Sequence, residues 1–425
     1  MKVNSGREED RSTLEEPEPK RAKPDNGGTS MELDSLRKIV TVKSWTQVVA
    51  GPTPEEEPQP SIWAWDDVSG ETLDPTEVRQ ARQVEMDYVY SRKVWRRVPR
   101  ALAVRNGWKV IPTRWIDTNK GDSVNPNYRS RLVAKEFNTG TQEGLFAATP
   151  PLEALRLLIS RAATRRAGAK SSSIMLNDVA RAFFEAPMTR TVCVELPTEA
   201  LAEGEEDMVG LLELSLYGTR DAAANFQSEV RKFMIGNGFA QSRFSPQLYF
   251  NEAKGLATLV HGDDFVSEGE NTALDWLASQ LSRRFEIKTH QIGLGEKQLR
   301  EHRILGRIVR ATSDGWEYEA DPRHAEVMVK VLRLEGANGV KTPGEEEKSW
   351  AAEENVRPLS VPEAREYRGL AARANYLGQD RADICYAAKE ACRGMAAPTL
   401  GDLRALRRLA RYLVHTPRVV WHYAW

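Results

Sequence analysis

The sequence predicts an α+β fold, and three observations support this prediction. Helix-type and strand-type periodicities alternate along residues 91–425, as in folds that pack helices against antiparallel sheets. Short β-rich runs are separated by Gly, Asn and Pro, which is typical of hairpins. The first 60 residues differ, because they contain seven prolines, two acidic runs and no sustained apolar period. We therefore expect residues 1–90 to be a mostly disordered leader.

The overall composition limits the class of protein. Lys and Arg number 60 against 61 Asp and Glu, a net charge of −1, which by itself favours neither a nucleic-acid nor a membrane partner. The three cysteines lack metal-ligand spacing and indicate a reducing compartment. No apolar run approaches the ~20 residues of a membrane span, and the acidic start is unlike a signal peptide. We expect an intracellular protein with no membrane partner. Whether it is found in a cytoplasmic particle or in the nucleus stays open.

The distribution of charge along the chain changes this interpretation of the partners. Residues 91–141 contain 12 basic and 3 acidic side chains, a local charge of +9, while residues 1–60 carry −3. Tryptophans and other aromatic residues are interleaved with these cations, and runs at 108–111 and 131–134 predict a small twisted sheet with hairpins. Such a surface suits phosphate backbones, although a solvated basic face has the same composition.

The remaining elements follow in order after Pro151. Leucines and Ile159 recur at helical spacing through Arg165, and the apolar run 173–179 contains Asp178 near its end. The other expected elements are a strand at 192–196, a helix at 221–237, β-rich arms at 257–261 and 265–267, a helix at 276–285, a strand at 303–309 and a helical tail at 362–413.

Asp263 and Asp264 stand at the tip of the hairpin between the two β-rich arms. If the strand that leads to Asp178 is a neighbour of this hairpin, three carboxylates converge at one edge of the sheet. Carboxylate oxygens suit Mg²⁺, and this arrangement is what two-metal phosphoryl transfer needs. In the alternative interpretation Asp178 caps a helix that begins at Val179. A second acidic pair, at residues 66 and 67, is interpreted as surface.

A series of blocks carries a resemblance to a known family. In order, they are Tyr128–Lys135, Phe146–Pro151 with the helix after it, Asn177–Phe183, Leu214–Ala222, Val260–Asp264, Phe285–Lys288, Leu305-Gly306, Tyr367–Tyr386 and Arg411–Leu413. From about Trp95 to Trp425 the chain thereby resembles the reverse transcriptase region of copia-type LTR retrotransposons. The resemblance implies a right-hand polymerase with fingers at 91–170, a palm at 171–310 and a thumb or connection at 311–425, without an RNase H domain.

The resemblance also implies an activity and its metal site. The activity is RNA-directed DNA synthesis, with an RNA template, a DNA primer and a dNTP as partners. Asp178, Asp263, Asp264 and the backbone carbonyl of Val179 would hold two Mg²⁺ ions, for which Mn²⁺ is a possible substitute. Asp264 would be the less direct ligand of the acidic pair.

The same resemblance implies roles for further residues. Arg131 and Lys135 would meet the triphosphate, and their spacing of four places both on one face of a strand. Phe183 would leave no space for a 2′-hydroxyl, although an ordinary core phenylalanine is the alternative. Tyr217 and Gly218 would line the nucleotide pocket. Leu305 and Gly306 would form the hairpin that grips the primer.

This sequence departs from the family pattern at several places. His261-Gly262 replaces Tyr-Val before the acids, and Asp221 replaces a residue that is usually Gln, which is expected to add negative charge near the nucleotide. A fragment, a degraded copy and a separate reading frame all stay open, as does the oligomeric state. Two alternative functions are an inactive remnant that only binds nucleic acid and an RNA-dependent RNA polymerase, since Gly-Asp-Asp is also a signature of those enzymes.

Overall fold

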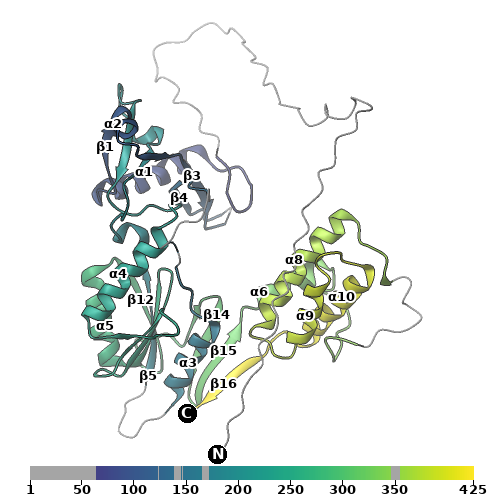
Figure 1. Cartoon of the computed structure of the whole chain (residues 1–425). Helices are drawn as coiled ribbons and strands as arrows, with labels where there is room; N and C mark the ends of the chain where they lie inside the picture. The colour runs from purple at the N-terminus through teal and green to yellow at the C-terminus, as the bar shows by residue number, and fades with distance from the viewer. Residues whose placement is uncertain (1–63, 123, 138–144, 146, 165–171, 346–354) are drawn as a thin grey trace, which may run out of the picture. The chain divides into compact units, whose positions relative to one another are not determined.

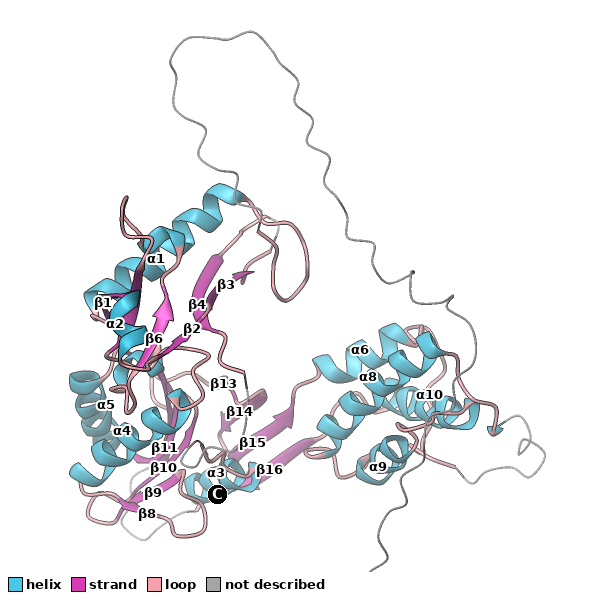
Figure 2. Cartoon of the chain, turned by 45° about the horizontal axis from the view of Figure 1, so that its top comes forward, coloured by secondary structure: helices cyan, strands magenta, loops and turns pink. Residues whose placement is uncertain are grey.

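The computed structural model describes residues 64–122, 124–137, 145, 147–164, 172–345 and 355–425 (Figure 1). Most of the expected leader and Phe146, which opens one of the family-like blocks, lie outside these residues. The described residues mix helices and strands (Figure 2), as the α+β prediction requires.

Part of the segment predicted as a leader, residues 1–90, is helical instead, because Pro75–Ser91 form helix α1. The Asp74 carboxylate accepts hydrogen bonds from the first backbone N–H groups of the helix, and Pro75 occupies a first-turn position, which together make a helix start. The surface interpretation of the acidic pair at 66 and 67 is wrong for Asp66. That side chain is buried and accepts three backbone N–H groups, whereas Asp67 is exposed.

The basic segment contributes two strands to a four-stranded sheet and forms a separate hairpin. The sheet has the order β1-β7-β6-β2, in which only the β2–β6 pair is parallel. Strands β3 and β4 pair with each other as the hairpin. The elements here are β1 (Trp95–Pro99), α2 (Arg100–Arg105), β2 (Lys109–Ile111), β3 (Thr113–Asn119), β4 (Tyr128–Ala134), β6 (Val192–Glu195), the short 3₁₀ helix η2 (Thr198–Ala200) and β7 (Met208–Leu212).

A six-stranded antiparallel sheet of order β12-β5-β11-β10-β9-β8 carries the predicted acids. Its strands are β5 (Ser172–Val179), β8 (Ala240–Gln241), β9 (Leu248–Asn251), β10 (Leu256–His261), β11 (Asp264–Glu270) and β12 (Ile287–Ile292). Helices α4 (Ala222–Gly236) and α5 (Asn271–Arg284) bury one face of this sheet, and α3 (Leu152–Ala163) packs on the other (Figures 1 and 2). The 3₁₀ helix η1 (Ala182–Glu185) follows β5 directly.

A second antiparallel sheet has the order β13-β14-β15-β16 and shares its core with α3. The strands are β13 (Glu301–Ile304), β14 (Arg307–Thr312), β15 (Gly315–Ala320) and β16 (Val420–Ala424). The single strand expected at 303–309 is therefore two strands, because Leu305 and Gly306 have positive φ angles and form a turn between them.

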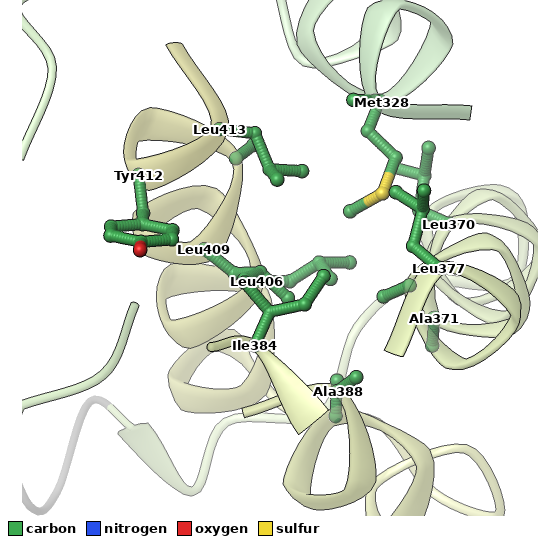
Figure 3. Packing of buried hydrophobic residues seen from close by; sticks show 14 of the residues in the cluster. Met328, Leu370, Ala371, Leu377, Ile384, Ala388, Leu406, Leu409, Tyr412 and Leu413 are labelled. Carbon is green, nitrogen blue, oxygen red and sulfur yellow. The ribbon is translucent and has the colours of Figure 1, made fainter. Parts of the chain in front are cut away.

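The helical tail is confirmed as a bundle with its own core. Helices α6 (Arg323–Val331), α8 (Val361–Gly378), α9 (Cys385–Arg393) and α10 (Leu400–His415) enclose buried leucines and Met328 (Figure 3). Capping boxes at Ser360 and Thr399 fix the starts of α8 and α10. In the described part of the chain, none of the helices is both long enough and apolar enough for a membrane span.

Candidate active site

Asp178 and Asp264 lie directly opposite one another on neighbouring strands. Asp178 is the penultimate residue of β5, Asp264 is the first residue of β11, and the antiparallel register pairs them. Side chains opposed in this way share one face of a sheet, with Cβ atoms about 5 Å apart. The strands are thus neighbours, as the prediction of converging carboxylates requires. The helix-cap alternative for Asp178 is wrong, because Val179 still belongs to β5.

Asp263 lies in the two-residue turn between β10 and β11. His261 and Asp264 close this turn as a pair, and Gly262 has a φ of +63°. A positive φ at the first turn residue is typical of a type II′ hairpin, and glycine adopts it without strain. The backbone N–H of Val179 donates to the carbonyl oxygen of Asp263 at 3.1 Å. The turn is therefore fixed to the end of β5.

Repulsion among the acids is evident at Asp264. Burial raises the pKa of this carboxyl, and the charges of Asp263 and Asp178 raise it further, to about 6. A cation placed beside the group would act in the opposite direction, since it favours the carboxylate form. The electrostatics of the three acids thus favour a bound cation.

The donor set suits a hard divalent ion. Three carboxylates and a backbone carbonyl offer only oxygen ligands, which Mg²⁺ prefers. As the side chains lie, no three His, Cys, Asp or Glu residues within the described ranges are grouped closely enough to hold a metal. Like-charged carboxylates repel one another. The backbone therefore places the three acids at one end of the sheet, and their oxygen atoms are ligands that suit the ions.

Tyr217 contacts both Phe183 and Arg131, although the three residues come from separate segments. The ring centroids of Phe183 and Tyr217 are 4.8 Å apart, and the Arg131 guanidinium lies 5.2 Å from the centre of the Tyr217 ring. Burial raises the pKa of Tyr217 to about 12, against the opposing charge of Arg131 and with a contribution from Asp263. The electrostatic effect of Asp263 on Tyr217 links this cluster to the acidic turn.

The two phenylalanines of η1 have different environments. Phe184 is fully buried, whereas Phe183 is only half-buried and packs at the edge of the core beneath α4 and α5. Phe184 is thus a core residue, while Phe183 packs against the core with part of its ring accessible. Phe183 has the partial exposure that a contact with a substrate requires.

Lys135 lies one residue past the end of β4, with an exposed side chain. Its backbone N–H donates to the carbonyl of Pro112. The prediction that Arg131 and Lys135 share one face of a strand is therefore wrong, because β4 ends at Ala134 and Lys135 lies beyond it.

Gly218 is required by a close approach to β4. Its φ is +82°, and a Cβ atom built on it would lie 2.0 Å from the carbonyl oxygen of Ala134. The N–H of Ala134 in turn donates to the carbonyl of Tyr217 at 2.7 Å. The backbone contact that glycine permits here is thus with β4, which carries Arg131.

Leu305 and Gly306 form the turn between β13 and β14, with φ angles of 48° and 76°. Positive angles at both central residues define a type I′ hairpin. The Arg307 guanidinium donates to the carbonyl of Leu305 at 2.7 Å, to the Tyr376 hydroxyl at 2.9 Å and to the Asp380 carboxylate at 2.9 Å. A buried ion pair thus holds this turn against the helical bundle.

Sequence reasoning missed a buried charge network next to the Tyr217–Gly218 loop. Arg190 donates to the carboxylates of Glu136 and Asp221, and Glu136 also accepts the backbone N–H of Arg220. Despite burial, these donors together with Lys109 lower the pKa of Glu136 to about 2. The expectation that Asp221 adds net negative charge near the nucleotide is wrong, because Asp221 is buried and paired with Arg190 at 2.9 Å.

Lys288 is a second residue that the sequence did not single out for a role. It lies on β12 directly opposite Asp178, so β11, β5 and β12 present Asp264, Asp178 and Lys288 in one row. Its position in the family-like block Phe285–Lys288 was the available signal, but only strand pairing places it beside the acids.

Sequence comparison gives the class of the protein. Residues 93–344 match the family described as reverse transcriptase (RNA-dependent DNA polymerase). This match covers more than half of the chain, and the chain belongs to that family. The resemblance to the reverse transcriptase region of copia-type retrotransposons is thereby confirmed.

Particular relatives are retrovirus-related Pol polyproteins of plant transposons. Those of transposons RE2 and RE1 from Arabidopsis thaliana are 26% and 27% identical over 318 residues, which is 72% of this chain and 20% of each relative. That of transposon TNT 1-94 from Nicotiana tabacum is 23% identical over 357 residues, 79% of this chain and 25% of the relative. The chain thus spans about a fifth to a quarter of the length of these relatives.

Among solved structures, the chain is similar to apo telomerase from Candida Tropicalis truncated from its C-terminal domain. The TM-score is 0.35 and the identity 10%, over 58% of this chain and 62% of that chain.

Proposed function

We propose that this chain is an RNA-directed DNA polymerase of a copia-type retroelement, which joins a dNTP to the 3′-hydroxyl of a DNA primer on an RNA template. The observation that carries the proposal is the register of Asp178 opposite Asp264, with Asp263 in the adjoining turn. Family membership supplies the reaction type. In the proposed division, residues 91–170 are the fingers, 171–310 the palm and 311–425 the thumb or connection.

Asp178, Asp263, Asp264 and the carbonyl of Val179 would hold two Mg²⁺ or Mn²⁺ ions. When bound, such ions supply activation of the attacking hydroxyl and stabilisation of the leaving pyrophosphate. The protein's own part is to fix the backbone of the acids on two paired strands and one tight turn, so that their positions in the sheet are set before substrate arrives.

The cluster around Tyr217 would bind the incoming nucleotide. Arg131 and Lys135 would donate charge-assisted hydrogen bonds to the triphosphate. Phe183 would lie under the sugar and exclude a 2′-hydroxyl, and Tyr217 with Gly218 would line the pocket. Leu305 and Gly306 would hold the primer end at the turn that Arg307 supports.

A second candidate is a protein that binds RNA–DNA hybrids without polymerising. The observation that favours it is that the described acids are not grouped as a metal site in their present placement. Binding through the basic segment 91–141 would weaken steeply with salt. An RNA-dependent RNA polymerase is a third candidate, because Gly262-Asp263-Asp264 matches the signature of those enzymes.

Primer extension distinguishes the three. Purified protein is incubated with oligo-dT on poly-rA, with dTTP or UTP, in Mg²⁺, Mn²⁺ or EDTA. The proposal predicts metal-dependent incorporation of dTTP and little of UTP. Hybrid binding without incorporation would support the second candidate, and preferential UTP incorporation the third.

A further inference from the structure

Arg181 has a backbone conformation that side chains rarely adopt. Its φ and ψ are 49° and 46°, in the left-handed region, between the end of β5 and η1. Residues with a Cβ atom are disfavoured there, and they persist only when the surrounding structure fixes them. Arg181 is three residues after Asp178 and two before Phe183. The conformation of this one residue therefore sets the path of the chain from the acid to the aromatic ring.

Helix α1 supplies the contacts that hold Arg181. The Arg181 Nε donates to Glu85 Oε2 at 2.8 Å, and the Glu85 side chain is only 3% exposed. The Arg181 guanidinium also lies 4.0 Å from the centre of the Tyr88 ring. The Tyr88 hydroxyl donates to the Glu286 carboxylate at 3.0 Å, and the Glu286 carbonyl accepts the N–H of Ala180 at 2.8 Å. The turn after β5 is thus held by α1 on one side and by Glu286 on the other.

Helix α1 is itself fixed at a second place. Arg82 pairs with Asp117 of β3 at 2.7 Å and with Glu199 at 3.0 Å. The ring of Tyr88 stacks on Phe184, with centroids 6.0 Å apart. The helix therefore spans from the β3–β4 hairpin to the turn after β5.

We propose that Glu85 and Tyr88 are positioning residues for the nucleotide site, which hold Arg181 so that Phe183 is set against the sugar. This inference rests on the proposed function. Helix α1 lies before residue 93, where the match to the family begins. Glu85 Oε1 is buried and has no hydrogen-bond partner among the described residues. Burying a carboxylate oxygen without a hydrogen bond destabilises the fold. The position of this carboxylate beside an arginine with left-handed backbone angles fits a positioning role for Glu85.

The test compares Glu85→Gln with Asp87→Asn, a matched substitution on the exposed face of α1 two residues away. The first readout is hydrogen–deuterium exchange of residues 180–186, which needs no activity. The N–H groups of Ala180, Phe184 and Ala186 are hydrogen-bonded within or beside this turn. Exchange here is expected to rise at least threefold in Glu85→Gln and to stay unchanged in Asp87→Asn. Arg181→Lys, which keeps a cation for Glu85, should lie close to the wild type.

The second readout is the ratio of dTTP to UTP incorporation at saturating primer-template. It is expected to fall at least threefold in Glu85→Gln, mainly through a higher KM for dTTP with little change in kcat. A merely structural role for Glu85 would lower stability without moving this ratio. If Glu85→Gln does not fold, Tyr88→Phe, which removes only the hydroxyl that binds Glu286, is expected to change both readouts in the same direction.

Equal exchange in the two carboxamide variants would overturn the proposal, and so would raised exchange with an unchanged nucleotide ratio. If the wild-type protein incorporates no nucleotide, the proposed function fails, and the claim that Glu85 acts on sugar selection fails with it. The exchange result then still decides whether α1 holds the turn.

Discussion

Asp178 and Asp264 face each other across one rung of an antiparallel strand pair. Strand positions are among the stiffest in a protein, so two of the three acids are placed by the sheet rather than by loops. The third, Asp263, is held by a turn whose carbonyl oxygen accepts the N–H of Val179. The rigidity of this arrangement suits a site in which charged groups must be positioned before substrate arrives.

Phe183→Ala is expected to admit ribonucleotides. The half-buried ring contacts Tyr217, and its removal opens space where the sugar would lie. Discrimination between dTTP and UTP should fall roughly tenfold or more. Competition between the two nucleotides in single-turnover extension measures this ratio. Phe233→Ala on α4 is the control, and equal discrimination in the two variants would refute the steric role of Phe183.

Glu136→Gln is expected to change the acid stability of the fold. The folded-state pKa of Glu136 is lowered to about 2, so its carboxylate stabilises the fold fully above the unfolded pKa of about 4.5. That stabilisation is lost as the pH falls from there through about 2. The wild type should exceed the variant by up to about 3 kcal/mol at pH 7, and the difference should shrink towards pH 3.

Urea unfolding at pH 7, 5 and 3 measures this difference. Glu77→Gln, at an exposed position of α1, is the control and should show no such convergence. A wild-type advantage that stays constant from pH 7 to pH 3 would contradict the account of the Glu136 network.

Asp380→Asn is expected to destabilise the protein by about 3 kcal/mol. The Asp380 carboxylate is buried and accepts hydrogen bonds from Arg307, Arg156 and Tyr318. Removing its charge leaves Arg307, which is also buried, without its counter-ion. Thermal and urea unfolding measure the loss. Asp314→Asn, at an exposed pair with His422, should change stability by less than about 0.5 kcal/mol.

Much of the fold could be predicted from periodicity and turn chemistry. The strand that contains Asp178, the hairpin at Gly262–Asp263 and the helical tail are all found where the sequence indicated. Each is a local pattern, in which apolar spacing or a glycine at a turn determines the structure. Helix α1 was missed because its apolar stripe is weak, although Asp74-Pro75 is a recognisable helix start.

The contacts that assemble the candidate site could not be predicted in the same way. The pairing of Asp221 with Arg190, and the placing of Lys288 opposite Asp178, depend on tertiary packing and strand order. Gly218 shows the same limit, since its backbone neighbour is Ala134, more than eighty residues earlier in the chain. A single sequence contains no local signal for such partners.

The most direct test of the central claim is extension of oligo-dT on poly-rA by Asp263→Asn beside Asp67→Asn. Both variants lose one carboxylate from an Asp-Asp pair, but Asp67 belongs to the pair remote in sequence from the family-like blocks. We expect Asp263→Asn to lower the extension rate by at least about 10²–10³-fold, with primer-template binding within a few-fold of the wild type. Asp67→Asn should extend normally. Extension by Asp263→Asn at the rate of Asp67→Asn would contradict the account.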